Sequence, residues 1–469
     1  MDNDRFDMIV IGAGPAGIFA ALEFTEKKPQ AKVLIVDTGR AISSRACPAR
    51  NGGQCRHCDP CAIVHGWAGA GAFSVGKLSL SDEVGGHVSD YIGHKRAMEY
   101  IHRADQQYLR FGASKTVHGL NNSRVEEIAY QCSRNDIHLV PCPVRHLGTE
   151  NAGPVLGAMH DYLITSTNTT FLELTSAQDI LCQDGKVIGA VLRRRGHEPE
   201  AVYAPCVVVA PGRGGAQWLT ETMGKLGVRT QNNEVDIGVR VEVPNAIMDH
   251  LTRDLYEAKL VYYSDTYENK VRTFCMNPGG EVSQEHYEGG IAVVNGHSYE
   301  DPARHTGNTN FALLVSTRFT EPFKQPIEYG RYIAQLGNML TGGPIMVQRL
   351  GDLLKGRRTD EKRLAKSTTI PTLATAVPGD LSFVLPARHL TSIVEALRAF
   401  DHVAPGLYSR DTLLYGVEVK FYSSKVLVNN SFETAISGLF AIGDGAGITR
   451  GLMQAGVTGM VVADEVSGR

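Results

Sequence analysis

Four of the nine cysteines of the chain lie within fifteen residues, in the stretch "CPARNGGQCRHCDPC" that begins at Cys47. Cys55, Cys58 and Cys61 are spaced C-x2-C-x2-C, the run with which bacterial ferredoxins wrap three thiolates around an iron–sulfur cubane. Cys47, followed by Pro48, could supply the fourth thiolate. The stretch is therefore a candidate [4Fe-4S] site, with Cys47, Cys55, Cys58 and Cys61 as its metal ligands.

Other chemistry is open to the same cysteines. Zinc suits the spacing less well, because zinc sites of four cysteines usually pair two C-x2-C knuckles across a longer loop. A CxxC pair is also a competent redox disulfide, and four small buried thiols without chemistry are the remaining alternative. The odd total of nine cysteines argues against a structural disulfide framework.

The elements that must position these cysteines begin with residues 7–37, which read as a strand, a glycine turn, a helix and a second strand. Gly12, Gly14 and Gly17 form GxGxxG at the turn into the helix, whose N-terminus would bind a pyrophosphate. Asp37 ends the second strand, where a carboxylate can accept hydrogen bonds from a ribose 2'-OH. The unit therefore predicts a Rossmann-type dinucleotide-binding domain.

The C-terminal motif "AIGDGAG" favours FAD over NAD as the dinucleotide. In flavoproteins with two dinucleotide domains, a Gly-Asp at the end of a late strand holds the ribityl chain and phosphate of FAD. Asp444 and a helix expected from about Leu452 match that pattern. The N-terminus of this helix would stabilise negative charge on reduced flavin by about 1 kcal/mol.

The strand patterns predict an α/β fold in which a Rossmann-type FAD-binding domain carries an inserted, mostly antiparallel α+β substrate domain. We expect the first part of the FAD-binding domain, with the Cys-rich loop 47–61, in residues 1–215. The inserted domain is expected in residues 216–409 and the last part of the FAD-binding domain in residues 410–469. A hairpin with Asp184-Gly185 as its turn is expected within residues 180–194.

The composition of the 469 residues narrows the classes of function. The net charge of −3 gives no electrostatic case for nucleic acid or an anionic membrane surface. The longest apolar runs are too short to span a bilayer. The N-terminus passes directly into a strand without the pattern of a secretion signal, which predicts a cytoplasmic protein.

Phrases that run almost end to end carry a family resemblance, among them "CPARNGGQCRHCDPC", "GWAGAGAFSVGKLSLSDEVGG", "DIGVRVEVP", "RTFCMNPGGEV" and "AIGDGAGITRGLMQAG". The chain resembles the bacterial family of uncharacterised FAD-dependent dehydrogenases, NAD(P)/FAD-dependent oxidoreductases with a glutathione-reductase-like FAD-binding fold. One departure is Val75, where the family usually has an aspartate. No role that needs that aspartate is carried over.

The motifs and the resemblance together imply FAD as the cofactor and a set of residues around it. The candidate cofactor-binding residues are Gly12, Gly14, Pro15, Ala16, Gly17, Asp37, Thr38, Gly69, Ala70, Gly71, Lys77, Ala210, Gly212, Gly443, Asp444, Gly445, Leu452, Met453 and Gln454.

The sequence contains one GxGxxG and no second one, so a dedicated NAD(P)H domain is not visible. Electrons would come from transiently bound NAD(P)H, from the substrate, or from a ferredoxin-like protein. Hydride transfer at the flavin requires an oriented C–H or C=C bond and a proton donor. Lys77, Tyr263 and His286 are the candidate catalytic proton donors.

Our first functional hypothesis is therefore an FAD-dependent dehydrogenase or ene reductase that acts on a C=C or CH–CH bond of a small apolar or conjugated molecule. An FAD-dependent isomerase without net redox change and a non-catalytic flavin-binding redox sensor are the alternatives. The mixed-charge stretch "KGRRTDEKR" at residues 355–363 could bind a carboxylate or a ferredoxin surface, or be a solvated loop.

Overall fold

The computed structural model describes residues 5–48, 56, 58–74, 76–120, 122–148, 150–287, 290–299, 301–319, 323, 325–420 and 423–469. The chain divides into two compact units. Unit 1 comprises residues 1–116, 145–233 and 422–469, and unit 2 comprises residues 117–144 and 234–421.

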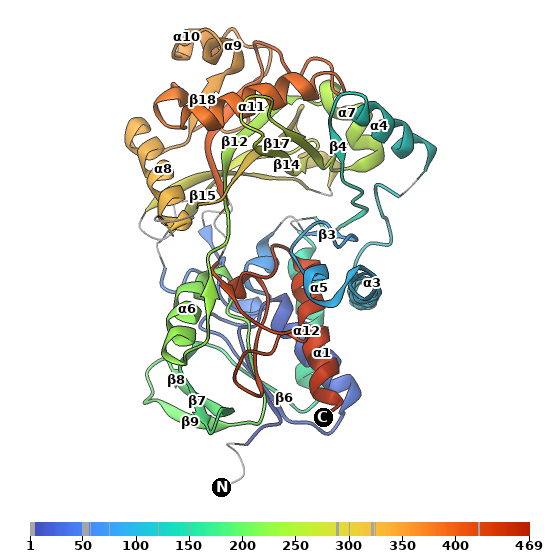
Figure 1. The fold of residues 1–469 in the computed structure, drawn as a ribbon, viewed down its shortest axis with the longest axis vertical. Helices are drawn as coiled ribbons and strands as arrows, with labels where there is room; N and C mark the ends of the chain where they lie inside the picture. Colours follow the sequence, from blue (N-terminus) through green and yellow to red (C-terminus); the bar gives the residue numbers. More distant parts are fainter. Residues whose placement is uncertain are drawn as a thin grey trace. The chain divides into compact units, whose positions relative to one another are not determined.

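A five-stranded sheet with only parallel neighbours forms the centre of unit 1 (Figure 1). The three strands in the middle of the sheet are buried along their whole length, which explains their nearly unbroken runs of Val, Ile and Leu. In spatial order they are β22 (Leu439–Ala441), β10 (Val207–Val209), β1 (Met8–Ile11), β2 (Val33–Val36) and β6 (Thr169–Leu172).

Two helices from opposite ends of the chain pack side by side in unit 1: α1 (Pro15–Lys27) and α12 (Leu452–Ser467) (Figure 1). Glycines on α12 make this close packing possible. A Cβ on Gly459 would overlap the backbone of Ala16 and Ala20, and a Cβ on Gly456 would lie 3.1 Å from the ring of Phe19. The N-termini of α1 and α12 are thereby brought to one edge of the sheet.

The remaining elements of unit 1 surround this core. The antiparallel sheet β7-β8-β9 has the expected hairpin turn at Asp184-Gly185, where both residues have positive φ. The elements are η1 (Ile42–Ser44), η3 (Gly69–Phe73), β3 (Lys77–Ser79), α2 (Ser89–Ile92), α3 (His94–Arg110), β5 (Val144–His146), α5 (Ala152–Ser166), β7 (Thr175–Gln183), β8 (Lys186–Arg194), β9 (Glu200–Tyr203), η4 (Arg213–Gly215), α6 (Ala216–Lys225), β11 (Thr230–Gln231), β21 (Lys425–Val426) and η7 (Asp444–Ala446).

An eight-stranded sheet forms the centre of unit 2, and it is antiparallel except for the pair β18-β19. In spatial order its strands are β19 (Val377–Pro378), β18 (Met346–Arg349), β20 (Leu413–Lys420), β12 (Val235–Pro244), β17 (Asn308–Thr317), β14 (Lys270–Asn277), β13 (Leu260–Tyr263) and β4 (His138–Leu139).

Helices pack against this sheet, and a hairpin of β15 (Glu281–Tyr287) and β16 (Ile291–His297) lies against its central strands. Apolar residues of α7, α8 and α11 share one core with alternate residues of β12. The other elements are α4 (Ser123–Ser133), α7 (Asn245–Leu255), η5 (Pro302–Arg304), α8 (Pro326–Thr341), α9 (Leu350–Leu353), α10 (Glu361–Leu364), η6 (Leu381–Phe383) and α11 (Ala387–Phe400).

The expected fold class, a Rossmann-type domain with an inserted α+β domain, is confirmed, whereas the bounds of the two units differ from the expected ones at three places. Residues 216–233 belong to unit 1, because α6 directly follows the loop at the end of β10. Residues 410–421 belong to unit 2, because β20 pairs with β12 and β18. Residues 117–144 join unit 2 through β4, a strand of two residues at the edge of the sheet.

Candidate cofactor-binding site

The loops that carry the predicted cofactor residues leave the carboxyl ends of neighbouring parallel strands. Ala210, after β10, donates its N–H to the Ile11 carbonyl at 2.7 Å, and Gly12, after β1, donates to the Val36 carbonyl at 2.8 Å. Ile442, after β22, donates to the Val209 carbonyl at 3.0 Å. The hydrogen-bond pattern of the parallel sheet therefore continues into the first residue of each of the three loops. In open α/β sheets, ligands bind at this edge.

The three glycines of the first loop have three different environments. A Cβ on Gly12, which has φ +109°, would overlap the carbonyl of Ala210, and a Cβ on Gly17 would overlap the Gly12 carbonyl oxygen. A Cβ on Gly14 would meet no atom within 4 Å among the described residues. Gly12 and Gly17 are thus required by the fold itself, whereas Gly14 leaves open space at the N-cap of α1, where a phosphate could approach the helix.

Asp37, after β2, uses its carboxylate to hold the loops around it. One oxygen accepts the N–H of Ala13 at 3.0 Å, and the other accepts the N–H groups of Gly39 at 2.8 Å and Gly66 at 2.7 Å. A carboxylate has about four acceptor positions, so a ribose hydroxyl could share this group. The residue expected to bind ribose therefore also fixes the glycine loop.

Residues 68–71 close over the same loop. The Ala68 N–H donates to the Ala13 carbonyl at 2.7 Å, and a Cβ on Gly69 would lie 3.3 Å from the Cα of Gly14. A Cβ on Gly71 would lie 2.8 Å from the side chain of Leu452, the first residue of α12. The segment that contains Gly69, Ala70 and Gly71 therefore lies beside the N-termini of α1 and α12, as the predicted pyrophosphate site requires.

Asp444 is the acidic side chain of the loop after β22, and its side chain is 24% exposed. Its Oδ1 accepts a hydrogen bond from Thr449 Oγ1 at 2.7 Å, and its Oδ2 lies 3.9 Å from Arg213 Nε. Burial raises the pKa of Asp444, and the positive charge of Arg213 opposes that shift. A carboxylate held by one hydroxyl and one cation at this edge could accept hydrogen bonds from a ribityl chain.

Glycines again bring the neighbouring loops into contact. A Cβ on Gly445 would lie 2.5 Å from the carbonyl oxygen of Gly212, and a Cβ on Gly443 would lie 3.0 Å from the Cβ of Ala16. Gly212 and Gly443 both have positive φ, at 63° and 74°. The predicted residues Ala16, Ala210, Gly212, Gly443 and Gly445 are thus brought together in space.

The start of α12 presents backbone rather than side-chain groups. The first N–H groups of a helix have no acceptor within it, so those of Leu452, Met453 and Gln454 could face a flavin. The amide of Gln454 is used elsewhere: it donates to the carbonyls of Asp82 at 2.9 Å and Val84 at 3.0 Å. The side chain of Gln454 therefore fixes the loop at residues 82–88, a role that its position in the motif does not predict.

His65 and Arg213 are residues of this site that sequence reasoning missed. His65 Nδ1 lies 2.9 Å from Thr38 Oγ1, and a Cβ on Gly214 would lie 2.7 Å from His65 Nε2. The imidazole thus joins the loop after β2 to the loop after β10. No motif identifies His65, whereas a basic residue among the glycines of "PGRGG" could have indicated Arg213.

The cysteine segment connects to this site at its C-terminal end. The N–H of His65 donates to the Cys61 carbonyl at 3.0 Å, and Arg45 binds the carbonyls of Ala62, Ile63 and Trp67. Cys58 is exposed, whereas Cys47 and Cys61 are partly buried. Cys55 lies outside the described residues, and among the residues that are described no three His, Cys, Asp or Glu side chains are grouped as metal ligands.

Of the three predicted proton donors, one lies in unit 1 and two lie in unit 2. Lys77 starts β3 of unit 1 and is partly buried. Tyr263 ends β13 of unit 2 with a side chain that is 59% exposed, and His286 lies exposed on β15, where its Nε2 is 3.1 Å from Gln284 Nε2. Tyr263 and His286 lie in different sheets of unit 2.

The residues present fit an FAD molecule. Gly14 leaves room where a phosphate would lie, and the N-termini of α1 and α12 lie at the same edge of the sheet. Asp37 and Asp444 lie in two of the loops at this edge. These groups match in kind the parts of FAD: a pyrophosphate, a ribose and a ribityl chain. The chemistry that FAD supplies when bound is the transfer of a hydride equivalent.

Part of the chain is similar to a known family of FAD-dependent proteins. Residues 234–421, the main segment of unit 2, match the family model "FAD-dependent protein, C-terminal domain-like". This match confirms the predicted resemblance to FAD-dependent proteins and supports FAD as the cofactor. A protein of Clostridium beijerinckii, described as uncharacterized, is 26% identical over 480 residues, which cover 98% of this chain and 80% of the relative.

The chain also aligns with solved structures at low sequence identity. A mutant of the E. coli quinol fumarate reductase FrdA is 14% identical with a TM-score of 0.44, over 99% of this chain and 70% of that chain. Glycine oxidase from Geobacillus kaustophilus is 13% identical with a TM-score of 0.38, over 100% and 96%. Both likenesses are weak, with TM-scores below 0.5. No helix among the described residues is both long and apolar enough to cross a membrane.

Proposed function

We propose that the protein is an FAD-dependent oxidoreductase that adds hydrogen to, or removes it from, a C=C or CH–CH bond of a small apolar or conjugated substrate. The observation that carries the FAD-dependent part is the convergence of three glycine loops and two helix N-termini at the carboxyl edge of the parallel sheet. The family match of residues 234–421 supports it independently.

Different residues of this chain would bind different parts of FAD or donate a proton. The open space at Gly14 and the N-terminus of α1 would bind the pyrophosphate, while Asp37 would orient the adenosine ribose and Asp444 the ribityl chain. The N-terminus of α12 would favour negative charge on the reduced ring. The proposed proton donors to the substrate carbon are Lys77, Tyr263 and His286.

Anaerobic reduction followed by reoxidation tests this function. The purified holoprotein is reduced with dithionite, and conjugated enoates and other alkenes are then offered in the absence of oxygen. The proposal predicts stoichiometric reoxidation of the flavin with reduction of one double bond. An alkene that is isomerised while the flavin stays in its starting redox state would instead identify an isomerase, and no response to any acceptor would favour a sensor.

An iron–sulfur cluster at Cys47, Cys55, Cys58 and Cys61 remains part of the proposal as a route of electrons to the flavin. The spacing C-x2-C-x2-C supports it, as does the attachment of Cys61, through His65, to the loops of the cofactor site. Analysis of iron and acid-labile sulfide in anaerobically purified protein tests it. Absence of both would remove the cluster and leave the flavin proposal standing.

A further inference from the structure

Charged side chains are few in the loops at the carboxyl edge of the parallel sheet in unit 1. The loops that directly follow β1, β2, β10 and β22 span residues 12–14, 37–41, 210–215 and 442–451. They carry two acidic and three basic residues: Asp37, Asp444, Arg40, Arg213 and Arg450. FAD would add the negative charges of two phosphates to an edge that already holds two aspartates, so cations at this edge favour its binding.

Arg213 lies in the middle of this edge. Its strand, β10, pairs with β22 on one side and with β1 on the other. A Cβ on Gly445 would lie 2.5 Å from the carbonyl oxygen of Gly212, and a Cβ on Gly214 would lie 2.7 Å from His65 Nε2. The two neighbours of Arg213 in the chain are thus packed against other loops of the site, which fixes the backbone from which its side chain starts.

The side chain of Arg213 reaches the loop that contacts the first turn of α1. Its Nε lies 3.9 Å from Asp444 Oδ2. A Cβ on Gly443, the residue before Asp444, would lie 3.0 Å from the Cβ of Ala16 in the first turn of α1. The N-terminus of α1 is the end proposed to bind phosphate, so this cation belongs to the part of the edge where the negative charge of FAD would lie.

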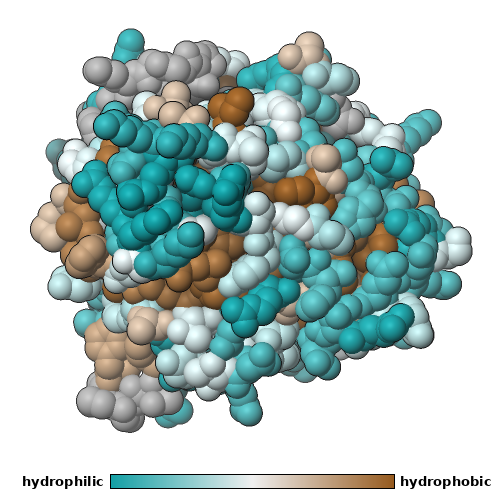
Figure 2. All heavy atoms as spheres, turned by 90° about the horizontal axis from the view of Figure 1, so that it is seen from above, coloured by the Kyte–Doolittle hydropathy of each residue, from teal (hydrophilic) through white to brown (hydrophobic). Residues whose placement is uncertain are grey.

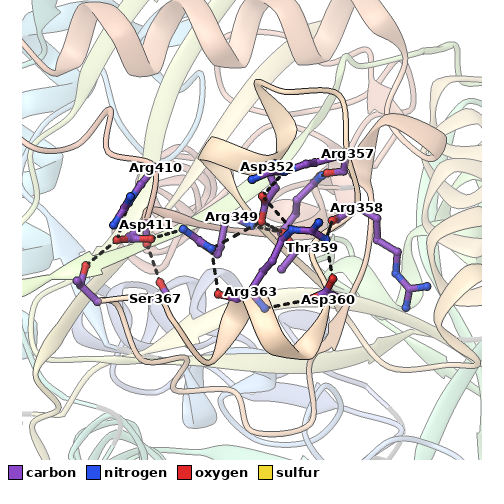
Figure 3. A network of polar contacts seen from close by, with 12 residues as sticks. Arg349, Asp352, Arg357, Arg358, Thr359, Asp360, Arg363, Ser367, Arg410 and Asp411 are labelled. Carbon is purple, nitrogen blue, oxygen red and sulfur yellow. Dashed lines mark hydrogen bonds and ion pairs between the residues drawn. The ribbon is translucent and has the colours of Figure 1, made fainter.

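The ion pair between Arg213 and Asp444 is long in comparison with a structural pair of unit 2 (Figure 3). There Arg349 Nη2 donates to Asp411 Oδ1 at 2.6 Å, and the two side chains are 11% and 6% exposed. Helices α9 and α10, which follow Arg349, lie at the face of unit 2 seen in Figure 2, where hydrophilic side chains gather beside apolar ones. Arg213, by contrast, is 46% exposed, and its distance of 3.9 Å from Asp444 is beyond hydrogen-bond range.

The other cations near the edge have different places. Arg450 precedes α12, whose N-terminus is proposed to face the flavin ring, and Arg40 follows β2 beside the aspartate proposed for the adenosine ribose. Lys77 begins β3, outside these loops. Burial raises the pKa of Asp444, and the charges of Arg213 and Arg450 oppose that shift. Arg213 is therefore the arginine that combines a position beside Asp444 with a loop in the middle of the edge.

We propose that Arg213 binds the pyrophosphate of FAD and thereby leaves Asp444 to accept hydrogen bonds from the ribityl chain. This inference rests on the proposed function, which requires FAD at this edge. A guanidinium presents its N–H donors in a planar fork that matches a phosphate group, so binding replaces one long ion pair with charged hydrogen bonds. The pyrophosphate is then bound by the N-terminus of α1 and by Arg213 together.

Binding of FAD to the apoprotein is the test, because it does not depend on turnover. The variants are R213Q, R213K, D444N and the double variant R213Q/D444N. The control is R5Q, which removes an exposed positive charge next to the amino end of β1, at the opposite edge of the same sheet. Dissociation constants of FAD are measured at low and at high salt. ADP, which has the two phosphates but neither the ribityl chain nor the flavin ring, is measured by competition.

We expect R213Q to bind FAD roughly tenfold to a hundredfold more weakly, as for the loss of a charged hydrogen bond, and R213K to lose less. The affinity for ADP should fall by a similar factor, and both losses should shrink at high salt. Addition of R213Q to D444N should lower FAD affinity by nearly the same factor again, because the two residues contact different parts of FAD. R5Q should change affinity less than about twofold.

No further loss on adding R213Q to D444N would overturn the proposal, because Arg213 would then act only by holding Asp444. Affinities of R213Q equal to those of R5Q would also overturn it, as would ADP that competes equally well in R213Q and the unaltered apoprotein, or not at all at millimolar concentration.

Thermal unfolding of each apoprotein separates loss of binding from loss of the fold, and R213K replaces R213Q in the comparison if R213Q does not fold. The outcome for the function is separate. An unaltered protein that binds no FAD would refute the proposed function, whereas FAD binding that R213Q leaves intact refutes only the role of Arg213.

Discussion

The carboxyl edge of the sheet in unit 1 and the central strands of unit 2 use polar groups in opposite ways. At the edge, glycines let backbone groups approach one another, and Gly14 leaves space that no described residue fills. In unit 2, the side chains of Asp236, Arg240 and Glu242 lie on one face of β12 and are fully or almost fully buried.

The buried carboxylate of Glu418 in unit 2 is compensated by two cations. Arg240 donates to Glu418 at 2.9 and 3.1 Å, and Lys420 Nζ lies 2.7 Å from the same carboxylate. Burial alone would raise the pKa of Glu418, but Arg240 and Lys420 keep it below its usual value. Polar groups beside open space thus favour unit 1 as the site for a cofactor. On this face of unit 2, by contrast, Arg240 is paired with Glu418, and Glu242 accepts hydrogen bonds from Asn308, Thr372 and Tyr415, which marks the face as structural.

Two alanine substitutions test this distinction at the glycine loop. Gly12→Ala is expected to abolish flavin retention and to lower the stability of unit 1 by about 3 kcal/mol or more, because its Cβ overlaps the Ala210 carbonyl. Gly14→Ala is expected to leave the melting temperature of the apoprotein unchanged while FAD affinity falls, because its Cβ meets only the space assigned to phosphate.

Gly224→Ala is the control for flavin retention by Gly14→Ala, since a Cβ there also meets no described atom within 4 Å. Because Gly224 lies in α6, this control is expected to raise the melting temperature slightly. Flavin content after dialysis and thermal unfolding of the apoprotein measure both effects. A Gly14→Ala protein that retains FAD as well as the Gly224→Ala control would remove Gly14 from the proposed site.

Glu418→Gln tests the buried pair of unit 2. The change leaves Arg240 buried without its anion and is expected to cost about 3–5 kcal/mol in the free energy of unfolding. Glu127→Gln, at an exposed ion pair with Arg124, should have no measurable effect.

The pH dependence sharpens the same test. Because the pKa of Glu418 is lowered in the folded protein, its stabilising contribution is present above the ordinary pKa of a glutamate and is lost as the pH falls through the folded value. Denaturant unfolding from neutral to acid pH should show this loss in the unaltered protein. An equally steep loss in the Glu418→Gln variant would contradict the assignment.

Asp444→Asn should separate binding from stability in unit 1. If the carboxylate binds the ribityl chain, FAD affinity falls by roughly ten- to a hundredfold, which corresponds to the loss of a charged hydrogen bond. The pKa of Asp444 is raised in the apoprotein, so this group costs stability as the pH rises through and above the ordinary pKa of an aspartate.

The Asp444→Asn apoprotein is therefore expected to be at least as stable as the unaltered one at neutral pH. Flavin titration and urea unfolding of both apoproteins measure the two quantities. Weaker binding together with a less stable apoprotein would mean that Asp444 acts on the fold and not on the cofactor.

His65→Gln should give the smallest effect. Loss of the contact with Thr38 Oγ1 is expected to cost about 0.5–1.5 kcal/mol, seen as weaker FAD binding by a few-fold. His197→Gln, at an exposed position of unit 1, is the control and should leave flavin binding unchanged. Identical flavin dissociation constants for the two variants would show that the His65 contact does not support the site.

Local pattern predicted much of this protein. The strand, glycine turn, helix and second strand expected in residues 7–37 are present as β1, α1 and β2, and the expected hairpin turns at Asp184-Gly185. The bounds of unit 2 were not predictable from the same signals. Strand β4 is two residues long, and its pairing with β13 brings residues from a distant part of the chain to the sheet edge.

The sequence by itself determined the βαβ unit with its glycines and the acidic residues Asp37 and Asp444, because these depend on short-range geometry that GxGxxG and "AIGDGAG" encode. Only the tertiary structure decided what their neighbours do. The amide of Gln454 turns to residues 82–84, His65 joins two loops, and the alternating charges of β12 are buried. Each of these depends on partners far away in the chain, and residue spacing carries no information about such partners.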